Sequence, residues 1–258
     1  MSEPRDWRAP VDDAGDGTLR YCDIAIGYLS RNPRYRAEYR RALAKVKRGR
    51  IVADAATAGL LRRWGISFHA APASAWNPEL AVVRPDLSPA SVILMSPPDI
   101  VAASPFAIGA LGTVRAAIRF DGAAHLIVAD PQGDLSLWLL APANNPVAIM
   151  LPVGDGLGPR FTEAERLRRH LRGLPAGPPA LLVPPARRRY LRTLLRVVAG
   201  RQAGVRAREL AAVLIDPKVR EYSAAAWDDS AERRQIGRWT IAAFELVNGG
   251  YIRLLRGG

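Results

Sequence analysis

The chain has 258 residues, with 37 Lys and Arg against 24 Asp and Glu, and a formal net charge of +13. Hydrophobic residues make up 49% and charged residues 24%, a balance that excludes a disordered chain and allows a buried core. The single cysteine, Cys22, excludes a disulfide framework and a cysteine-rich zinc site, and it favours a cytoplasmic protein.

The basic charge is concentrated at the two ends of the chain. The net charge is +6 over residues 1–70, −3 over residues 71–154 and +10 over residues 155–258. This segregation predicts an anionic partner for the ends. Nucleic acid is favoured over an anionic membrane surface or an acidic protein. A coding preference for Arg over Lys would explain the choice of side chain but not its uneven distribution.

Residues 1–18 are expected to form a loose lead-in, followed by a basic helical domain over residues 19–70. Apolar and aromatic residues recur at helical spacing from Tyr21 to Val46 and are interrupted at Asn32 and Pro33, which predicts two short helices. Asn32 is expected to cap the second of them, with the proline in its first turn. A third helix is predicted over residues 53–64, ending at Gly65.

Residues 71–154 are expected to form a linker and a small antiparallel β-meander. One strand is predicted over residues 91–95, within a crossing that is rich in proline and alanine. Turn signals separate the short apolar runs that follow. These runs predict strands over residues 113–120, 125–130, 135–140 and 147–151.

Residues 155–258 are expected to form a helical domain, and the fold class expected for the whole chain is α+β. Thr162 is predicted to start the first helix and Asp229 to cap the last and longest one, which Gly249 and Gly250 would end. A proline-rich linker at residues 175–185 separates the first helix from the others. The predicted helices cover residues 162–174, 187–199, 206–215 and 229–247.

The last three predicted helices have the outline of a helix-turn-helix DNA reader, because a short glycine-containing turn joins the first two. At about 100° per residue, the apolar residues of 229–247 share one side of the helix. Arg234, Gln235 and Arg238 share the other side, in the first turns. Because arginine pairs with guanine edges and glutamine with adenine edges in the major groove, these three are predicted to read bases.

Other basic residues are expected to position the protein on DNA without reading its sequence. The expected phosphate contacts are Arg187, Arg188, Arg189, Arg192, Arg206, Arg208 and Arg233, the last with a structural ion pair as its alternative. The expected contacts of the N-terminal domain with DNA or a partner are Arg31, Arg34, Tyr35, Arg36, Tyr39, Arg40 and Arg41. For the arginines in the first turns of 229–247, the alternative is a solvated helix face.

Two sets of motifs carry a resemblance to a known family. In the C-terminal domain they are Arg187–Arg189, Leu194–Arg196, Ala203–Gly204, Arg208–Ala211, Trp227, Arg233, Arg238, Leu246–Tyr251 and Leu254–Arg256. On these motifs residues 184–256 resemble a proteobacterial domain described as a transcription-factor DNA-binding domain. Residues 28–40 resemble the transcriptional-regulator-like domain that often precedes it, and Trp64, Gly65 and the meander fit the longer members.

The resemblance implies a DNA-binding transcriptional regulator similar to the frameshifted excision activator of integrative and conjugative elements. Such an activator turns on excision or transfer of the element. Some relatives of the C-terminal domain act instead as antiactivators that bind the activator protein. This sequence departs from the family pattern in three places: Arg206 replaces a capping serine, Asp216 a glycine, and Trp239 a smaller aliphatic residue.

No residue pattern predicts an enzyme, a metal site or a cofactor. The three histidines, His69, His125 and His170, are far apart in sequence and are expected to be surface or packed residues. Ser104 and Ser136 lack the context of a catalytic nucleophile. The glycine-rich run at 154–158 lacks the Lys-Ser/Thr of a phosphate-binding loop and is interpreted as linker. Cys22 is expected to be an inert thiol.

Two other functions remain open beside DNA binding. A protein-interaction module would use the aromatic residues Tyr28, Tyr35, Tyr39 and Trp64 as interface anchors. Alternatively, the meander would sense a small molecule. The partners expected are double-stranded DNA, RNA polymerase or a regulatory protein, and a second copy of the chain. No membrane partner is expected, because the N-terminus is polar and prolines interrupt the most apolar window, residues 135–153.

Overall fold

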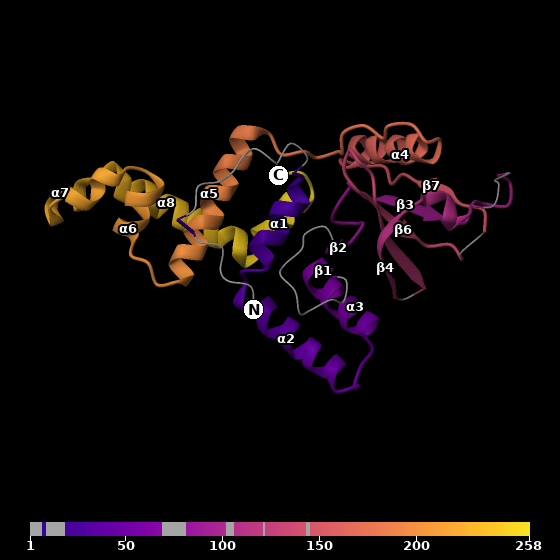
Figure 1. The fold of residues 1–258 in the computed structure, drawn as a ribbon, viewed down its shortest axis with the longest axis horizontal. Coiled ribbons are helices and arrows are strands. Elements are labelled where there is room, and N and C mark those ends of the chain that lie inside the picture. The colour runs from indigo at the N-terminus through magenta and orange to yellow at the C-terminus, as the bar shows by residue number, and fades with distance from the viewer. Residues whose placement is uncertain (1–6, 9–18, 69–80, 102–105, 121, 143–144) are drawn as a thin grey trace.

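The computed structural model describes residues 7–8, 19–68, 81–101, 106–120, 122–142 and 145–258. Helices from the N-terminal part of the chain and a larger group from its C-terminal part lie beside a five-stranded sheet (Figure 1). The expected α+β class is therefore confirmed. Of the predicted lead-in, only Trp7 and Arg8 lie within the described residues. Trp7 is buried in the helical core, so ordered packing begins before Leu19.

The three N-terminal helices form where the sequence predicts them. They are α1 (Tyr21–Leu29), α2 (Pro33–Lys47) and α3 (Ala53–Trp64). The side-chain oxygen of Asn32 accepts hydrogen bonds from the backbone amides of Arg34 and Tyr35, which confirms it as the cap of α2. Gly65 ends α3 in a left-handed conformation, with φ of 73°.

The sheet is a meander that has gained a central strand. Its strands are β3 (Val92–Met95), β4 (Val114–Phe120), β5 (Ala123–Val128), β6 (Leu135–Leu139) and β7 (Ala148–Met150), in the order β4-β5-β6-β3-β7. β3 pairs parallel with β6, and the other neighbours are antiparallel. A continuous buried run in β3 suits this central position. β1 (Ile66–Phe68) and β2 (Ala81–Val83) form a separate antiparallel pair.

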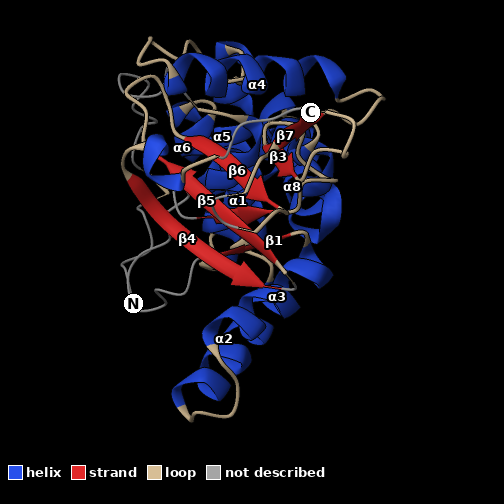
Figure 2. Ribbon diagram, turned by 90° about the vertical axis from the view of Figure 1, so that its right-hand side faces the viewer, coloured by secondary structure: helices blue, strands red, loops and turns tan. Residues whose placement is uncertain are grey.

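Helix α4 (Leu157–Leu171) covers one face of the sheet (Figure 2). It begins at Leu157, so the predicted start at Thr162 is wrong. The Thr162 hydroxyl lies inside the helix and donates to the carbonyl of Gly158. The glycine-rich run interpreted as linker therefore supplies the first residues of α4. Buried Leu167 joins α4 to the core of the sheet, in which the short 3-10 helix η2 (Ile108–Leu111) also packs.

The C-terminal region contains more elements than predicted. It has the helices α5 (Pro185–Gln202), α6 (Ala207–Leu214), α7 (Ala224–Asp229), α8 (Ala231–Glu245) and α9 (Tyr251–Leu255), the 3-10 turn η3 (Pro217–Glu221) and the π turn η4 (Leu246–Gly250). Ser230, not Asp229, caps α8 by accepting from the amide of Arg233, because Asp229 ends α7. The longest of the described helices is α5, not α8. Gly249, with φ of 137°, kinks the chain at the predicted stop.

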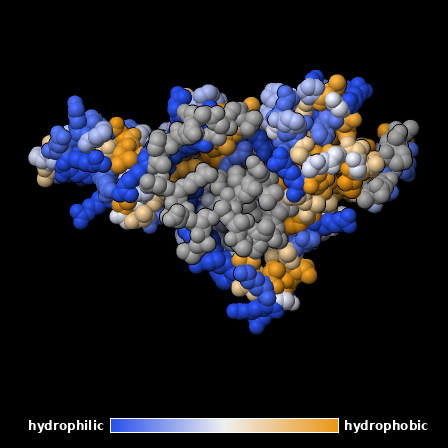
Figure 3. All heavy atoms as spheres, in the orientation of Figure 1, coloured by the Kyte–Doolittle hydropathy of each residue, from blue (hydrophilic) through white to orange (hydrophobic). Residues whose placement is uncertain are grey.

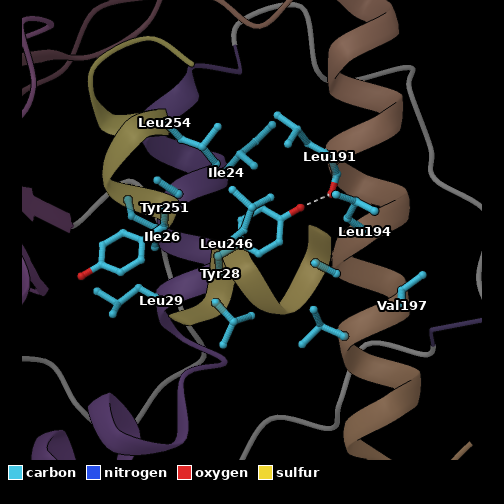
Figure 4. Close-up of a cluster of buried hydrophobic side chains, with 14 of the residues drawn as sticks. Ile24, Ile26, Tyr28, Leu29, Leu191, Leu194, Val197, Leu246, Tyr251 and Leu254 are labelled. Carbon is cyan, nitrogen blue, oxygen red and sulfur yellow. Dashed lines mark hydrogen bonds between the residues drawn. The ribbon is translucent and has the colours of Figure 1, made fainter. Parts of the chain in front are cut away.

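One hydrophobic core joins the N-terminal and C-terminal helices. α1 lies between α5 and α9, and its buried side chains meet Leu191, Leu194 and Leu254 (Figure 4). The hydroxyl of Tyr28, fully buried in α1, donates to the backbone carbonyl of Leu191 at 2.6 Å. The sheet has a second core beneath α4, and a third cluster packs Ile93 and Trp138 of the sheet with Leu61 of α3. The N-terminal helix α1 and the C-terminal helices from α5 onward therefore belong to one packed helical body, whereas α4 belongs with the sheet.

Candidate nucleic-acid interface

Helix α8 presents a basic face to solvent while its other side packs on α5 and α6. Ile236 and Ala243 are buried, with exposed fractions of 1% and 0%. Arg234 and Arg238 are exposed and Gln235 is half-buried. The predicted division of this helix into an apolar and a polar side is therefore present. The two arginines are open to a partner, and their contact with bases stays a prediction.

The arginines at the start of α8 are held by surface interactions. Arg233 forms an ion pair with Asp228 at 2.9 Å, and Arg234 donates to the carbonyl of Asp229 at 2.9 Å. Arg238 donates to the side chain of Gln235. Such exposed interactions contribute little free energy, so a polyanion can replace them at low cost. Figure 1 places α7 and the start of α8 at the end of the molecule farthest from the sheet, where Figure 3 shows a mostly hydrophilic surface with some hydrophobic atoms.

The two arginines at the start of α6 have different surroundings. Arg206 precedes the helix and is exposed. Arg208 is half-buried, and its guanidinium donates to the carbonyls of Val219 and Arg220, both at 3.1 Å, and to that of Tyr222. Arg208 therefore fastens the η3 turn to α6. Of these two arginines, only Arg206 is exposed to solvent.

Four of the arginines of α5 lie in its first two turns. Arg187 and Arg189 are exposed, whereas Arg188 and Arg192 are half-buried. The guanidinium of Arg187 lies 5.6 Å from the ring centre of Tyr190. The residues just before α5 pair with Leu19 and its neighbours, at the start of α1. Figure 1 places the start of α5 apart from the start of α8, so this basic group is separate from the arginines of α8.

The N-terminal domain exposes the arginines of α2, whereas Tyr28 and Tyr35 are buried and Tyr39 and Trp64 are half-buried. Arg34, Arg36, Arg40 and Arg41 are exposed on α2, and Arg31 donates to the carbonyl of Gly27 at 2.7 Å. Tyr35 is 3% exposed, with its ring 6.1 Å from Tyr39 and 5.6 Å from Trp64. Burial raises the pKa of the Tyr35 hydroxyl. In this position Tyr35 stabilises the core, as does Tyr28, and neither ring is available as an interface anchor.

Some basic residues of the C-terminal segment are internal. Arg166 and Glu163 are 2% and 1% exposed and form an ion pair at 2.8 Å. Arg160 is 7% exposed and donates to the carbonyls of Ser91 and Pro85, and burial lowers its pKa. These arginines join α4 to the segments around the sheet. Arg160 therefore contributes to the net charge of the sequence without facing a polyanion, and the charges of Arg166 and Glu163 cancel.

A cavity of about 420 Å³, with both polar and apolar lining residues, lies between α1 and the sheet. Its lining includes Arg20, Asp23, Ser91, Arg115, Asp134 and Ser136. The two arginines pair with the two carboxylates at 3.3 and 3.2 Å, and the two serine hydroxyls lie 3.2 Å apart. Cys22 also lines the cavity, and burial raises the pKa of its thiol to about 12, which keeps it protonated and unreactive.

The described histidines are packed residues. His125 is 1% exposed and bonds to Ser136 at 3.0 Å. The ring of His170 lies between the Asp130 carboxylate, at 2.9 Å, and the Leu111 carbonyl, at 3.0 Å. His69 and Ser104 lie outside the described residues. In the described part of the chain no three His, Cys, Asp or Glu side chains gather as a metal site. Nor does any described helix have the length and apolar character to cross a membrane.

Comparison with protein families confirms the resemblance found in the sequence. Residues 6–69 match the model of a proteobacterial transcriptional regulator-like domain. Residues 90–149, which include most of the sheet, match a domain of unknown function, DUF7012. Residues 150–256 match the model of a T6SS transcription factor DNA-binding domain. No curated protein matches the chain, and no solved structure matches it.

Proposed function

We propose that this chain, which carries a proteobacterial transcriptional regulator-like domain and a transcription factor DNA-binding domain, binds specific DNA sequences through α8. Support comes from the exposure of Arg234 and Arg238 on one face of a helix whose opposite face is anchored in the core. α5, α6 and α8 would act as the helix-turn-helix unit. The first turns of α8 would enter the major groove, where arginine can bond guanine edges.

The other exposed arginines would hold phosphates. Arg206 is the best placed of them to hold a phosphate, because it precedes the first turn of α6, where backbone amides also favour an anion. Arg187 and Arg189 of α5, and the exposed arginines of α2, would contact more distant DNA or a partner protein. RNA polymerase, a regulatory protein or a second copy of the chain would be such partners.

The biological role that we propose is activation of genes for excision or transfer of an integrative and conjugative element. The resemblance to the excision activator supports this role. The matched DNA-binding family is named for a T6SS transcription factor, so secretion-system genes are the second candidate target. A footprint across the promoters that neighbour the gene would distinguish the two.

Fluorescence anisotropy with labelled duplexes tests the DNA-binding roles. Arg238→Ala should narrow the difference in affinity between a preferred and a scrambled duplex, because a base contact is lost. Arg206→Ala should weaken both duplexes alike and reduce the dependence of log K on log salt by about one unit. Equal effects of the two substitutions on both duplexes would overturn the assignment. Absence of duplex binding at low salt would overturn DNA binding itself.

The cavity between α1 and the sheet favours a second role, the sensing of a small polar ligand. It touches both the helical core, through Cys22 and Ile26, and the sheet, through Ser136. A bound ligand would therefore stabilise both parts together. A metabolite panel in a thermal-shift assay, repeated with Ser136→Val, tests this role. A ligand that raises the melting temperature of both forms equally would not bind in this cavity.

A further inference from the structure

The exposed face of α8 contains a glycine and an isoleucine beside its arginines. Arg234, Gly237, Arg238 and Ile241 share this face, because residues three, four and seven apart lie on one side of a helix. All four are exposed. No acidic residue occurs between Glu232 and Glu245. We call these four residues the α8 strip.

Gly237 has no reason within the fold to be glycine. Its backbone is helical, and a Cβ added to it would meet no atom within 4 Å from the rest of the described structure, apart from its own helix turn. Glycine is disfavoured inside a helix, because it loses the most backbone freedom on folding. Packing in the described part of the chain would therefore tolerate alanine, which forms helices better. A glycine at such a position allows the helix backbone to approach an external surface closely.

Ile241 is an isolated apolar side chain on the same strip. It is 73% exposed, four residues after Gly237 and three after Arg238. In the major groove the C5-methyl group of thymine is the apolar feature of the base edges. A strip of two arginines, a glycine and an isoleucine, without a carboxylate, matches a surface of negative charge that also carries methyl groups.

We infer that the α8 strip is the surface that lies in the major groove of DNA, with Gly237 at the closest approach of the backbone and Ile241 against a thymine methyl group. The inference rests on the proposed DNA-binding function and adds to it a steric and an apolar contact. It makes Ile241 a specificity-determining residue and Gly237 a positioning residue. The strip thereby reads thymine as well as guanine.

The steric part predicts opposite effects on stability and binding. Gly237→Ala and Gly237→Leu should raise the melting temperature, because both residues favour the helix more than glycine does. The leucine variant should also weaken duplex binding at least tenfold, and the alanine variant less. Gly59→Ala is the matched control, since Gly59 is exposed inside α3 and its added Cβ also meets no atom within 4 Å. It should raise the melting temperature and leave binding unchanged.

The apolar part is tested with duplexes that lack the thymine methyl group. A duplex selected by the wild-type protein from a randomised pool would be made again with deoxyuridine in place of thymidine. The wild-type protein should bind the uracil duplex about three- to tenfold more weakly. Ile241→Ala should bind both duplexes equally, at about the wild-type affinity for the uracil duplex.

The outcomes separate this inference from the proposed function. Unchanged wild-type affinity for the uracil duplex, or wild-type binding by Gly237→Leu, would overturn the inference while leaving DNA binding intact. If the wild-type protein enriches no duplex at low salt, the proposed function fails and the inference fails with it.

Discussion

The side-chain amide of Asn32 donates a hydrogen bond of 2.9 Å to the backbone carbonyl of Val247, 215 residues further along the chain. The oxygen of the same amide caps α2. One buried side chain therefore fixes the start of the basic N-terminal helix against the turn that follows α8. This bond is direct evidence that the regulator-like and DNA-binding domains are packed as one body.

Substitutions at Asn32 should separate its two roles. Asn32→Ser keeps an oxygen that can cap α2 but loses the amide donor, and should lower the free energy of unfolding by about 1–3 kcal/mol. Asn32→Ala also loses the cap, which should cost about 1 kcal/mol more. Urea denaturation followed by tryptophan fluorescence measures both. A serine variant as stable as the wild type would show that the bond to Val247 does not contribute.

The buried ion pair of α4 should matter far more than its exposed counterpart. Arg166→Met leaves the carboxylate of Glu163 buried without its cation, and should lower the free energy of unfolding by about 3–5 kcal/mol. Arg168→Met removes the ion pair between Arg168 and Glu165, which has the same spacing on the same helix. The side chains of Arg168 and Glu165 are 47% and 49% exposed. This substitution should leave the melting temperature unchanged. Similar shifts in the two variants, measured by calorimetry, would contradict this prediction.

Arg206 and Arg208 should differ in what they stabilise. Arg208→Ala removes the donor for three carbonyls in and beside η3, and should lower the melting temperature by several degrees. Arg206→Ala should leave the melting temperature unchanged and weaken DNA binding. Thermal unfolding and anisotropy on the same samples measure both effects. Loss of stability in the Arg206 variant would assign it a structural role.

Alkaline pH should destabilise the protein before it affects the native thiol. Burial raises the pKa of Cys22 and of Tyr251 to about 12 and also raises that of Tyr28. Because these pKa values are higher in the folded than in the unfolded chain, the associated stability is complete below about pH 8.5 and decreases as the pH rises. The melting temperature should therefore be constant from pH 7 to 8 and fall above pH 9.

Alkylation of Cys22 provides the second measurement. Iodoacetamide at pH 8 should modify the thiol slowly in the native protein and rapidly in urea, because the buried thiol remains protonated. Rapid modification without denaturant would mean that the start of α1 opens readily.

Local signals predicted the elements whose determinants are adjacent in sequence. An asparagine followed by proline identified the start of α2, and Gly65 the end of α3, because capping involves atoms within one turn. Where two adjacent residues can both cap a helix, local sequence does not decide between them. Ser230 and Asp229 can both cap a helix, and the serine does so in the structure because Asp229 completes α7. The start of α4 was missed because Thr162 resembles a cap but lies inside the helix.

For the candidate site, helical periodicity was sufficient to place Arg234 and Arg238 on the outward face of α8. It did not distinguish Arg206 from Arg208, because the carbonyls that engage Arg208 come from a turn whose path the sequence does not specify. It also treated Tyr35 as a partner contact, although the aromatic rings of α2 and α3 cover one another. Periodicity does not single out Gly237 and Ile241, since their significance depends on their exposure among the residues that the structure describes.

The amino-acid sequence by itself determined the α+β class, most of the helices and strands, the resemblance to regulator and DNA-binding domains, and the polar face of α8. The helices, the strands and the polar face depend on periodicity or on contacts within a few residues, and the resemblance depends on motifs shared with known families. Tertiary structure decided which cations face solvent, where β3 enters the sheet, and that α1 lies in one core with α5 and α9. Those features depend on contacts between residues far apart in the chain, which no local pattern encodes.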